Sequence, residues 1–391
     1  MNNNNFCHMP WHGIAIAANG NVKPCCQYSH GVDQVGSGTD ITAAYNNDQM
    51  KRIRSQFLQG ESPSGCNSCW QREQQIGTSR RIWFDEKFGQ YIPTGYEYTE
   101  NVTDPVWIQA DINFSNVCNL KCRMCGSWAS NQWFDEELRL ANIDTKFMKN
   151  KNPVPLVQHD LAQLQSMLPH IQHMRRIDFK GGEPMLAKYH NQFLDWLIDK
   201  GHNKSITLQY TTNGTVINPG IVDRLSKFEN VRIMFSVEGT GSLYQYIRGG
   251  AHSLEEVVDN IFKYDQLDNV LIGFNVTIQA YNILNLRELH KFLHALPLKH
   301  GSAIGAFTTI CNNPDYLSPF VVPDDLRDLA VDRLSGIAEF RHLSDQLQKR
   351  LWDTSKWQTF IEYTQYLDEW RREDIIDHIP EFKNHWRKYK Q

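Results

Sequence analysis

The chain has 391 residues, enough for two or three domains, and 41% of them are hydrophobic while 21% are charged. This balance excludes a small disulfide-stapled scaffold and a wholly disordered chain. The 40 Lys and Arg residues against 44 Asp and Glu give a formal net charge of -4, which supplies no broad cationic surface, so a nucleic acid partner is not expected.

The N-terminus, Met-Asn-Asn-Asn-Asn-Phe, lacks the basic start and the apolar core of a secretory signal peptide. No run in the sequence reaches the roughly 18 apolar residues of a membrane-spanning helix. We therefore expect a cytoplasmic protein that makes no membrane contact. Because the cytoplasm is reducing, its nine cysteines are expected to bind metal or to take part in redox chemistry rather than to form disulfides.

Residues 1–105 are rich in Asn, Gln, Gly and Ser and predict a small domain that contains a β-hairpin. The hairpin signal is the Asn19-Gly20 turn, which follows the apolar run from Gly13 to Ala18. From about residue 106, strand-like apolar runs alternate with amphipathic segments, a pattern typical of β-α units and a parallel sheet. We expect this α/β domain to span residues 106–311 and a helical extension to span residues 312–391.

Six strands are expected in the α/β domain, connected by right-handed crossovers through helices. The expected strands cover residues 106–114, 176–180, 205–211, 231–237, 270–278 and 303–310. The expected helices cover residues 161–167, 189–198, 221–228, 254–264 and 286–296. In the extension, Val322-Pro323-Asp324-Asp325 predicts a helix start, because a proline and two acids suit a first turn.

Three cysteines follow the first of these strands, in the order Cys118-Asn-Leu-Lys-Cys122-Arg-Met-Cys125. In a β/α barrel the loops beyond the carboxyl ends of the strands form the active site. Three neighbouring thiolates can bind three irons of a cubane cluster, and the missing fourth leaves one iron open to a substrate or cofactor. A zinc knuckle or a set of incidental thiols is the alternative, although structural zinc normally has four protein ligands.

This C-x-x-x-C-x-x-C loop resembles that of the radical S-adenosylmethionine (SAM) enzymes, which carry it after the first strand of a partial (β/α)6 barrel. The resemblance implies that Cys118, Cys122 and Cys125 hold a [4Fe-4S] cluster whose open iron binds the amino and carboxylate groups of SAM. It also implies that one electron, supplied by a reductase such as flavodoxin or ferredoxin, cleaves SAM to a 5′-deoxyadenosyl radical.

Short motifs follow the next strands in barrel order. After the second strand come Gly181, Gly182, Glu183 and Pro184, where glycines allow close backbone approach and a carboxylate can meet an ammonium group. By the resemblance this motif contacts the methionine amine of SAM, and a plain β-to-α turn is the alternative. Asn213 and Ser236, at the ends of the third and fourth strands, offer polar groups where the ribose hydroxyls would lie. Arg248 resembles the arginine that pairs with the methionine carboxylate, with a surface arginine as the alternative.

A second group of cysteines has the pattern C-x12-G-x4-C followed by C-x2-C and consists of Cys7, Cys25, Cys66 and Cys69. It resembles the Twitch half of the SPASM auxiliary-cluster domain, which in most relatives follows the barrel and here precedes it. Four thiolates suit either a second, auxiliary [4Fe-4S] cluster or Zn, and the resemblance favours the cluster. Neighbouring side chains on a strand point to opposite faces, so Cys25 and Cys26 are not both expected to be ligands, and the spacing of the motif favours Cys25.

Together these features predict a radical SAM oxidoreductase or modifying enzyme that abstracts hydrogen from its substrate with help from the auxiliary cluster. The resemblance favours a ribosomal peptide or protein as the substrate, because relatives with the auxiliary domain modify peptides and proteins most often. A small polar metabolite such as a sugar, an aminoglycoside or a nucleotide is the alternative. The alternative of a different class is a non-catalytic iron-sulfur or zinc protein, which would need no site for the cofactor amine. No catalytic acid, base or histidine is assigned.

Overall fold

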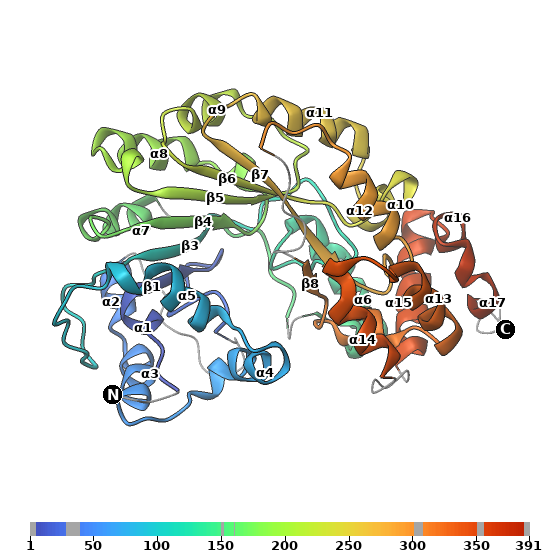
Figure 1. Cartoon of the computed structure of the whole chain (residues 1–391), viewed down its shortest axis with the longest axis horizontal. Helices are drawn as coiled ribbons and strands as arrows, with labels where there is room; N and C mark the ends of the chain where they lie inside the picture. The colour runs from blue at the N-terminus through green and yellow to red at the C-terminus, as the bar shows by residue number, and fades with distance from the viewer. Residues whose placement is uncertain are drawn as a thin grey trace. The chain divides into compact units, whose positions relative to one another are not determined.

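The computed structural model describes residues 5–28, 40–149, 152–159, 161–300, 308–349 and 356–386 (Figure 1). The chain divides into two compact units. The first unit comprises residues 1–117, 156–210 and 218–232, and the second comprises residues 118–155, 211–217 and 233–391. Within the described ranges, no helix combines the length and the apolar character needed to cross a lipid bilayer.

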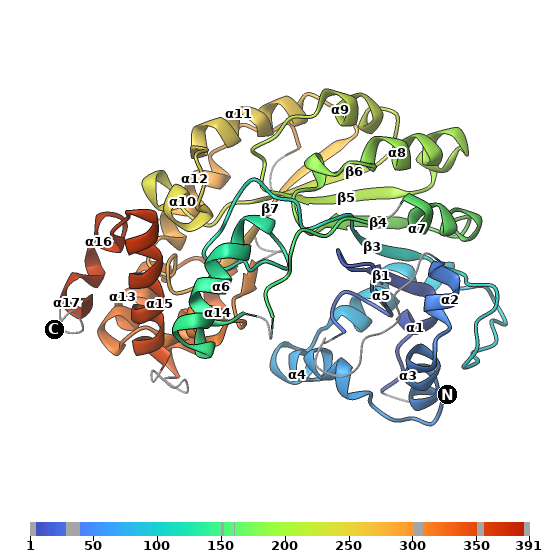
Figure 2. The ribbon, with the colours of Figure 1, turned by 180° about the vertical axis from the view of Figure 1, so that it is seen from behind.

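The strands of the described residues follow one another in the hydrogen-bonded order β2-β1-β3-β4-β5-β6-β7-β8. Figure 2 labels β1 and β3 to β7 of this series. Their bounds are β1 Gly13–Ile16, β2 Val22–Lys23, β3 Gln109–Asn113, β4 Arg176–Lys180, β5 Thr207–Thr212, β6 Val231–Ser236, β7 Val270–Ile278 and β8 Thr308–Ile310. Neighbours among β1, β3, β4 and β5 run parallel, as do β7 and β8. The predicted α/β class is therefore confirmed, and the six expected strands are β3 to β8. The first residues of the strand expected over 303–310 lie outside the described residues.

The predicted hairpin is present, and its strands extend the sheet. β2 pairs antiparallel with β1, and the connecting turn has Gly20 at φ +82° with its N–H donating to the Ala17 carbonyl oxygen at 2.9 Å. β1 in turn pairs parallel with β3, with Gly13 opposite Gln109 and Ile16 opposite Ile112. The sequence predicted the hairpin but not this pairing, so the sheet has eight strands where the α/β region alone supplies six.

The helices alternate with the strands as the apolar periodicity predicts. Those of the first unit are α1 Met9–His12, α2 Ile41–Tyr45, α3 Asp48–Leu58, α4 Asn67–Ile76, α5 Arg80–Phe88, α7 Leu161–Ser166, α8 His190–Asp199 and α9 Pro219–Leu225. Those of the second unit are α6 Phe134–Ile143, α10 Gly241–Arg248, α11 Leu254–Asp265, α12 Leu286–His294, α13 Asp324–Leu334, α14 Arg341–Gln348, α15 Lys356–Arg371, α16 Ile375–His378 and α17 Lys383–Trp386. The five expected crossover helices are α7, α8, α9, α11 and α12, and the helical extension consists of α13 to α17.

Helix α11 illustrates why these segments fold locally as they do. The Ser253 hydroxyl accepts a hydrogen bond from the Glu256 N–H at 3.2 Å, and the Glu256 carboxylate accepts one from the Ser253 N–H at 3.3 Å, which forms a capping box. Leu254, Val257 and Ile261 recur at helical spacing and are all buried. The start of the helix is thus set by a cap and its orientation by one apolar face.

Candidate active site and cluster sites

The loop after β3 carries the three predicted ligands Cys118, Cys122 and Cys125. Cys122 is buried, whereas Cys118 and Cys125 are half-buried. The Cys125 thiol donates a hydrogen bond that lowers the pKa of Cys122 to about 7, against the opposing effect of burial, and the same bond raises the pKa of Cys125. A thiol that ionises near neutral pH is already in the form that binds metal. The chemistry of this loop therefore fits a metal or cluster site.

Arg248, at the end of α10, lies in the same unit as the cysteine loop and is buried. Its Nη1 atom lies 2.9 Å from the Glu238 carboxylate, and its positive charge helps to lower the pKa of Cys122. The Arg248 Nε atom is buried and has no hydrogen-bond partner in the described part of the chain. The surface-arginine alternative is thus wrong, and Arg248 presents an unused donor in the surroundings of the cysteines.

Asn213, just beyond β5, contacts the cysteine loop. Its Nδ2 atom lies 3.7 Å from the Cys118 sulfur and donates to Asn119 Oδ1 at 2.9 Å, while its Oδ1 accepts from the Thr215 N–H at 2.9 Å. The structure therefore brings Asn213 together with Cys118. Ser236 is the last residue of β6 and is half-buried. Its predicted contact with the ribose stays a prediction.

The turn Gly181–Pro184 follows β4 in the first unit and packs against its own chain. Gly181 and Gly182 have φ values of +72° and +56°, and a Cβ at Gly182 would lie 2.4 Å from the Val117 carbonyl oxygen. Glu183 is buried, and its carboxylate accepts a hydrogen bond from the Met185 N–H at 3.1 Å. Gly182 is thus required by the close approach of this turn to the chain just before Cys118, and Gly181 by its approach to the Asn113 side chain.

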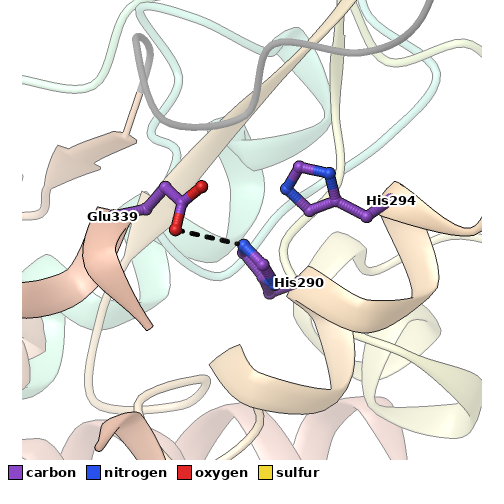
Figure 3. Close-up of side chains that lie close together, drawn as sticks. All are labelled: His290, His294 and Glu339. Carbon is purple, nitrogen blue, oxygen red and sulfur yellow. Dashed lines mark ion pairs between the residues drawn. The ribbon is translucent and has the colours of Figure 1, made fainter. Parts of the chain in front are cut away.

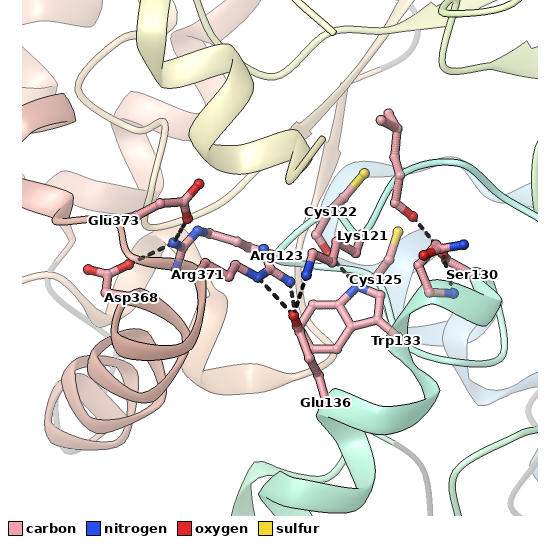
Figure 4. A network of polar contacts seen from close by, with 12 residues as sticks. Lys121, Cys122, Arg123, Cys125, Ser130, Trp133, Glu136, Asp368, Arg371 and Glu373 are labelled. Carbon is pink, nitrogen blue, oxygen red and sulfur yellow. Dashed lines mark hydrogen bonds and ion pairs between the residues drawn. The ribbon is translucent and has the colours of Figure 1, made fainter. Parts of the chain in front are cut away.

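Arg123, between Cys122 and Cys125, anchors the cysteine loop to the helical extension (Figure 4). Its side chain is fully buried, with Nη2 at 2.6 Å from the Asp368 carboxylate on α15 and a second ion pair to Glu373. The guanidinium also donates to the Tyr246 carbonyl oxygen at 2.9 Å and lies 3.6 Å from the centre of that ring. The loop that carries the cysteines is therefore fixed by residues of the C-terminal helices.

Further contacts hold the same loop from α6 and α15. Glu136 on α6 accepts from Lys121 at 2.7 Å and from Arg371 of α15 at 2.6 Å (Figure 4). The Arg123 carbonyl oxygen accepts from Lys149 Nζ at 2.7 Å and from the Tyr363 hydroxyl at 2.8 Å. Sequence reasoning missed this network, since its members are separated by up to 250 residues and belong to no local motif.

The four N-terminal cysteines line one cavity in the first unit. They come from the segment before α1, the segment after β2, the residue before α4 and the first turn of α4, and are Cys7, Cys25, Cys66 and Cys69. Arg80 and Arg81 line the same cavity and supply positive charge. Burial raises the pKa of Cys7 and Cys25 and raises that of Cys66 to about 12. These thiols stay protonated until a metal displaces the protons, and the two arginines suit the negative charge of a thiolate-bound cluster.

Cys26 lies outside this cavity, in the surroundings of a buried ionic cluster on β3 and β4. Burial raises the pKa of Cys26, and the Asp111 carboxylate adds to this effect. Asp111 forms ion pairs with Lys180 and with Arg80, the latter at 3.3 Å, and these outweigh burial and lower the pKa of Asp111. Asp178 lies 3.4 Å from Arg80 and completes the cluster. Apart from polar residues at alternate positions of two strands, no sequence pattern predicted this cluster.

The comparisons with known proteins match two regions of the chain. Residues 112–293 match the family model of the Radical SAM superfamily, and residues 7–70 match the SPASM model, described as an iron-sulfur cluster-binding domain. No curated protein matches the sequence.

Solved structures resemble the chain at low identity. They include native anSMEcpe with bound AdoMet, at 16% identity and a TM-score of 0.43 over 62% of this chain and 63% of that chain. Streptococcus suis SuiB bound to precursor peptide SuiA has 13% identity and a TM-score of 0.36 over 66% of this chain and 55% of that chain. TsrM from Kitasatospora setae, with tryptophan substrate and a SAM analog, has 12% identity and a TM-score of 0.34 over 52% of this chain and 35% of that chain. The chain therefore spans less than two thirds of each of these proteins. The two matches thus place a region similar to the Radical SAM superfamily at residues 112–293, preceded at residues 7–70 by a region similar to the iron-sulfur cluster-binding SPASM domain.

Proposed function

We propose that the protein is a radical SAM enzyme in which Cys118, Cys122 and Cys125 hold the catalytic [4Fe-4S] cluster. The observation that carries the proposal is the cysteine loop itself, which lies within the Radical SAM match and contains a thiol with a pKa near 7. When bound, the cluster and SAM supply a 5′-deoxyadenosyl radical that abstracts a hydrogen atom from the substrate. The chain's own task is to bind, orient and shield these groups.

Arg248 is the residue we assign to the SAM carboxylate. Its guanidinium already forms a buried ion pair with Glu238 and retains an unpartnered Nε donor, so a second carboxylate can be added without breaking the first pair. Asn213, which lies beside Cys118 and donates to the Asn119 side chain, is assigned to the ribose together with Ser236. The contact of Gly181–Pro184 with the methionine amine is carried over from the family resemblance as a prediction.

The four cysteines of the N-terminal cavity are proposed to hold the auxiliary [4Fe-4S] cluster. The SPASM match over residues 7–70 supports this assignment over Zn, because that family is described as iron-sulfur cluster-binding. Arg80 and Arg81 line the cavity and would offset the negative charge of the cluster. The pattern of the cysteines is that of the Twitch half of such domains.

A peptide or protein is the substrate class that we propose, because relatives with a SPASM domain modify peptides and proteins most often. A flavodoxin or ferredoxin is the proposed electron donor. Addition of the substrate should accelerate SAM cleavage, so a screen of candidate peptides against sugars and nucleotides identifies the class.

The experiment that tests the function is SAM cleavage by anaerobically reconstituted protein with a strong reductant. We expect slow formation of 5′-deoxyadenosine and methionine without added substrate. Replacement of Cys118, Cys122 and Cys125 by alanine should abolish it. Cys311→Ala removes a buried cysteine outside both motifs and is the matched control, which should retain cleavage. Full cleavage by the triple variant would show that the proposed function is wrong.

A further inference from the structure

His290, His294 and Glu339 form a compact group in the second unit that includes no cysteine (Figure 3). His290 and His294 are four residues apart on α12 and so lie on one face of the helix. Glu339 belongs to the short 3-10 helix η11, Ala338–Phe340. One ligand atom from each of the three side chains lies within 4.8 Å of the other two, and the two imidazole centres are 4.2 Å apart.

One nitrogen of His290 points between these side chains without a hydrogen bond. Its Nε2 atom is buried and has no hydrogen-bond partner in the described segments, since the Glu339 carboxylate at 3.5 Å is too far for a good hydrogen bond. An imidazole nitrogen without a competing hydrogen bond is a suitable metal ligand.

Hydrogen bonds between the segment before His290 and the segment before Glu339 fix the separation of the ligands. Arg287, on α12, donates to the Ser335 carbonyl oxygen at 2.6 Å, and Arg333, on α13, donates to the Leu284 carbonyl oxygen at 2.7 Å. These bonds tie the start of α12 to the end of α13, from which the chain runs directly into η11. The site is thus set by anchored backbone rather than by three independent surface side chains.

We propose that His290, His294 and Glu339 bind a divalent transition metal ion such as Zn2+. Two imidazoles and one carboxylate are a ligand set that zinc accepts, with a fourth position left for water. Because Glu339 is about one-third exposed, at 34%, the ion can enter from solvent. The ion links α12 to the helical extension, and this structural role does not depend on radical chemistry.

The test is calorimetric titration of Zn2+ into the full chain with its iron-sulfur clusters reconstituted, so that the cysteines are occupied. We expect one zinc per chain, and His294→Ala and Glu339→Gln should each weaken binding on the order of tenfold or more. Both side chains are exposed, so these variants should fold. His342→Ala removes another exposed histidine of the same unit and should leave the affinity unchanged.

A second measurement is the thermal midpoint with and without Zn2+. Zinc should raise it in the parent and in His342→Ala but not in His294→Ala, because a ligand of the folded state stabilises that state. Equal zinc affinities of His294→Ala and His342→Ala would overturn the proposal. So would zinc binding that disappears only when the cysteines are replaced.

Discussion

Replacing Arg123 by alanine tests whether the helical extension holds the cysteine loop. The guanidinium is fully buried between Asp368 and Glu373 and packs on the Tyr246 ring. Its removal leaves the buried Asp368 carboxylate without its cation, and burial already raises the pKa of that carboxyl. Breaking a buried ion pair by removing one partner costs about 3–5 kcal/mol, so we expect a loss of this size in the free energy of unfolding.

The matched control is an exposed ion pair that also ends on α15. It joins Lys146, which lies between α6 and α7 in the chain, to Glu362 of α15 at 2.6 Å, and the two side chains are 42% and 32% exposed. Lys146→Ala should therefore cost less than about 1 kcal/mol. Urea unfolding followed by tryptophan fluorescence compares the two variants under the same anaerobic conditions. A cost for Arg123→Ala no larger than that for Lys146→Ala would refute the reasoning.

A double variant separates the ion pair from the loss of packing. Arg123→Ala with Asp368→Asn removes the cation and its nearest anion together, so it should cost less than the sum of the single variants. Strictly additive costs would mean that the two side chains do not interact. Loss of iron in Arg123→Ala that exceeds the loss in Lys146→Ala would show that the contact also positions the cluster ligands.

The parts of the fold that the sequence predicted are those set by local patterns. The alternation of apolar runs predicted β3 to β8 and the helices between them, because each strand and each amphipathic helix carries its own periodicity. The hairpin turn at Asn19-Gly20 was predicted for the same reason. The pairing of β1 with β3 joins residues about 96 positions apart, such as Gly13 and Gln109, and no local signal encodes it.

The candidate sites show the same contrast between local sequence patterns and contacts of residues far apart in the chain. Both cysteine groups were visible from their spacing, and that spacing favoured Cys25 over Cys26 for the cavity that Cys25 lines in the structure. Arg123 stands inside the first motif but its partner Asp368 is 245 residues away. The spacing of His290 and His294 was also visible, yet two histidines on a helix are a weak signal until Glu339 is placed beside them.

Three further predictions test individual residues. Gly182→Ala should destabilise the fold by about 1–3 kcal/mol more than Gly77→Ala. Both glycines have positive φ, but of the two only Gly182 would bring a Cβ against backbone, 2.4 Å from a carbonyl oxygen. Equal losses in the free energy of unfolding, measured with urea, would contradict that close approach. Cys25→Ala should reduce bound iron from about eight to about four per chain while Cys26→Ala leaves it near eight, and reversed losses would make Cys26 the ligand. Burial lowers the pKa of His190 from 6.5 to about 4, so the unfolded chain binds this proton near pH 6.5 while the folded protein binds it only near pH 4. The stability from neutral His190 is therefore fully present above pH 6.5 and falls by about 2 kcal/mol on lowering the pH to about 5. Urea unfolding at about pH 8 and about pH 5 measures how far the free energy of unfolding falls between the two. His190→Phe should make this fall smaller by about 2 kcal/mol. An unchanged fall would show that His190 titrates normally in the folded protein.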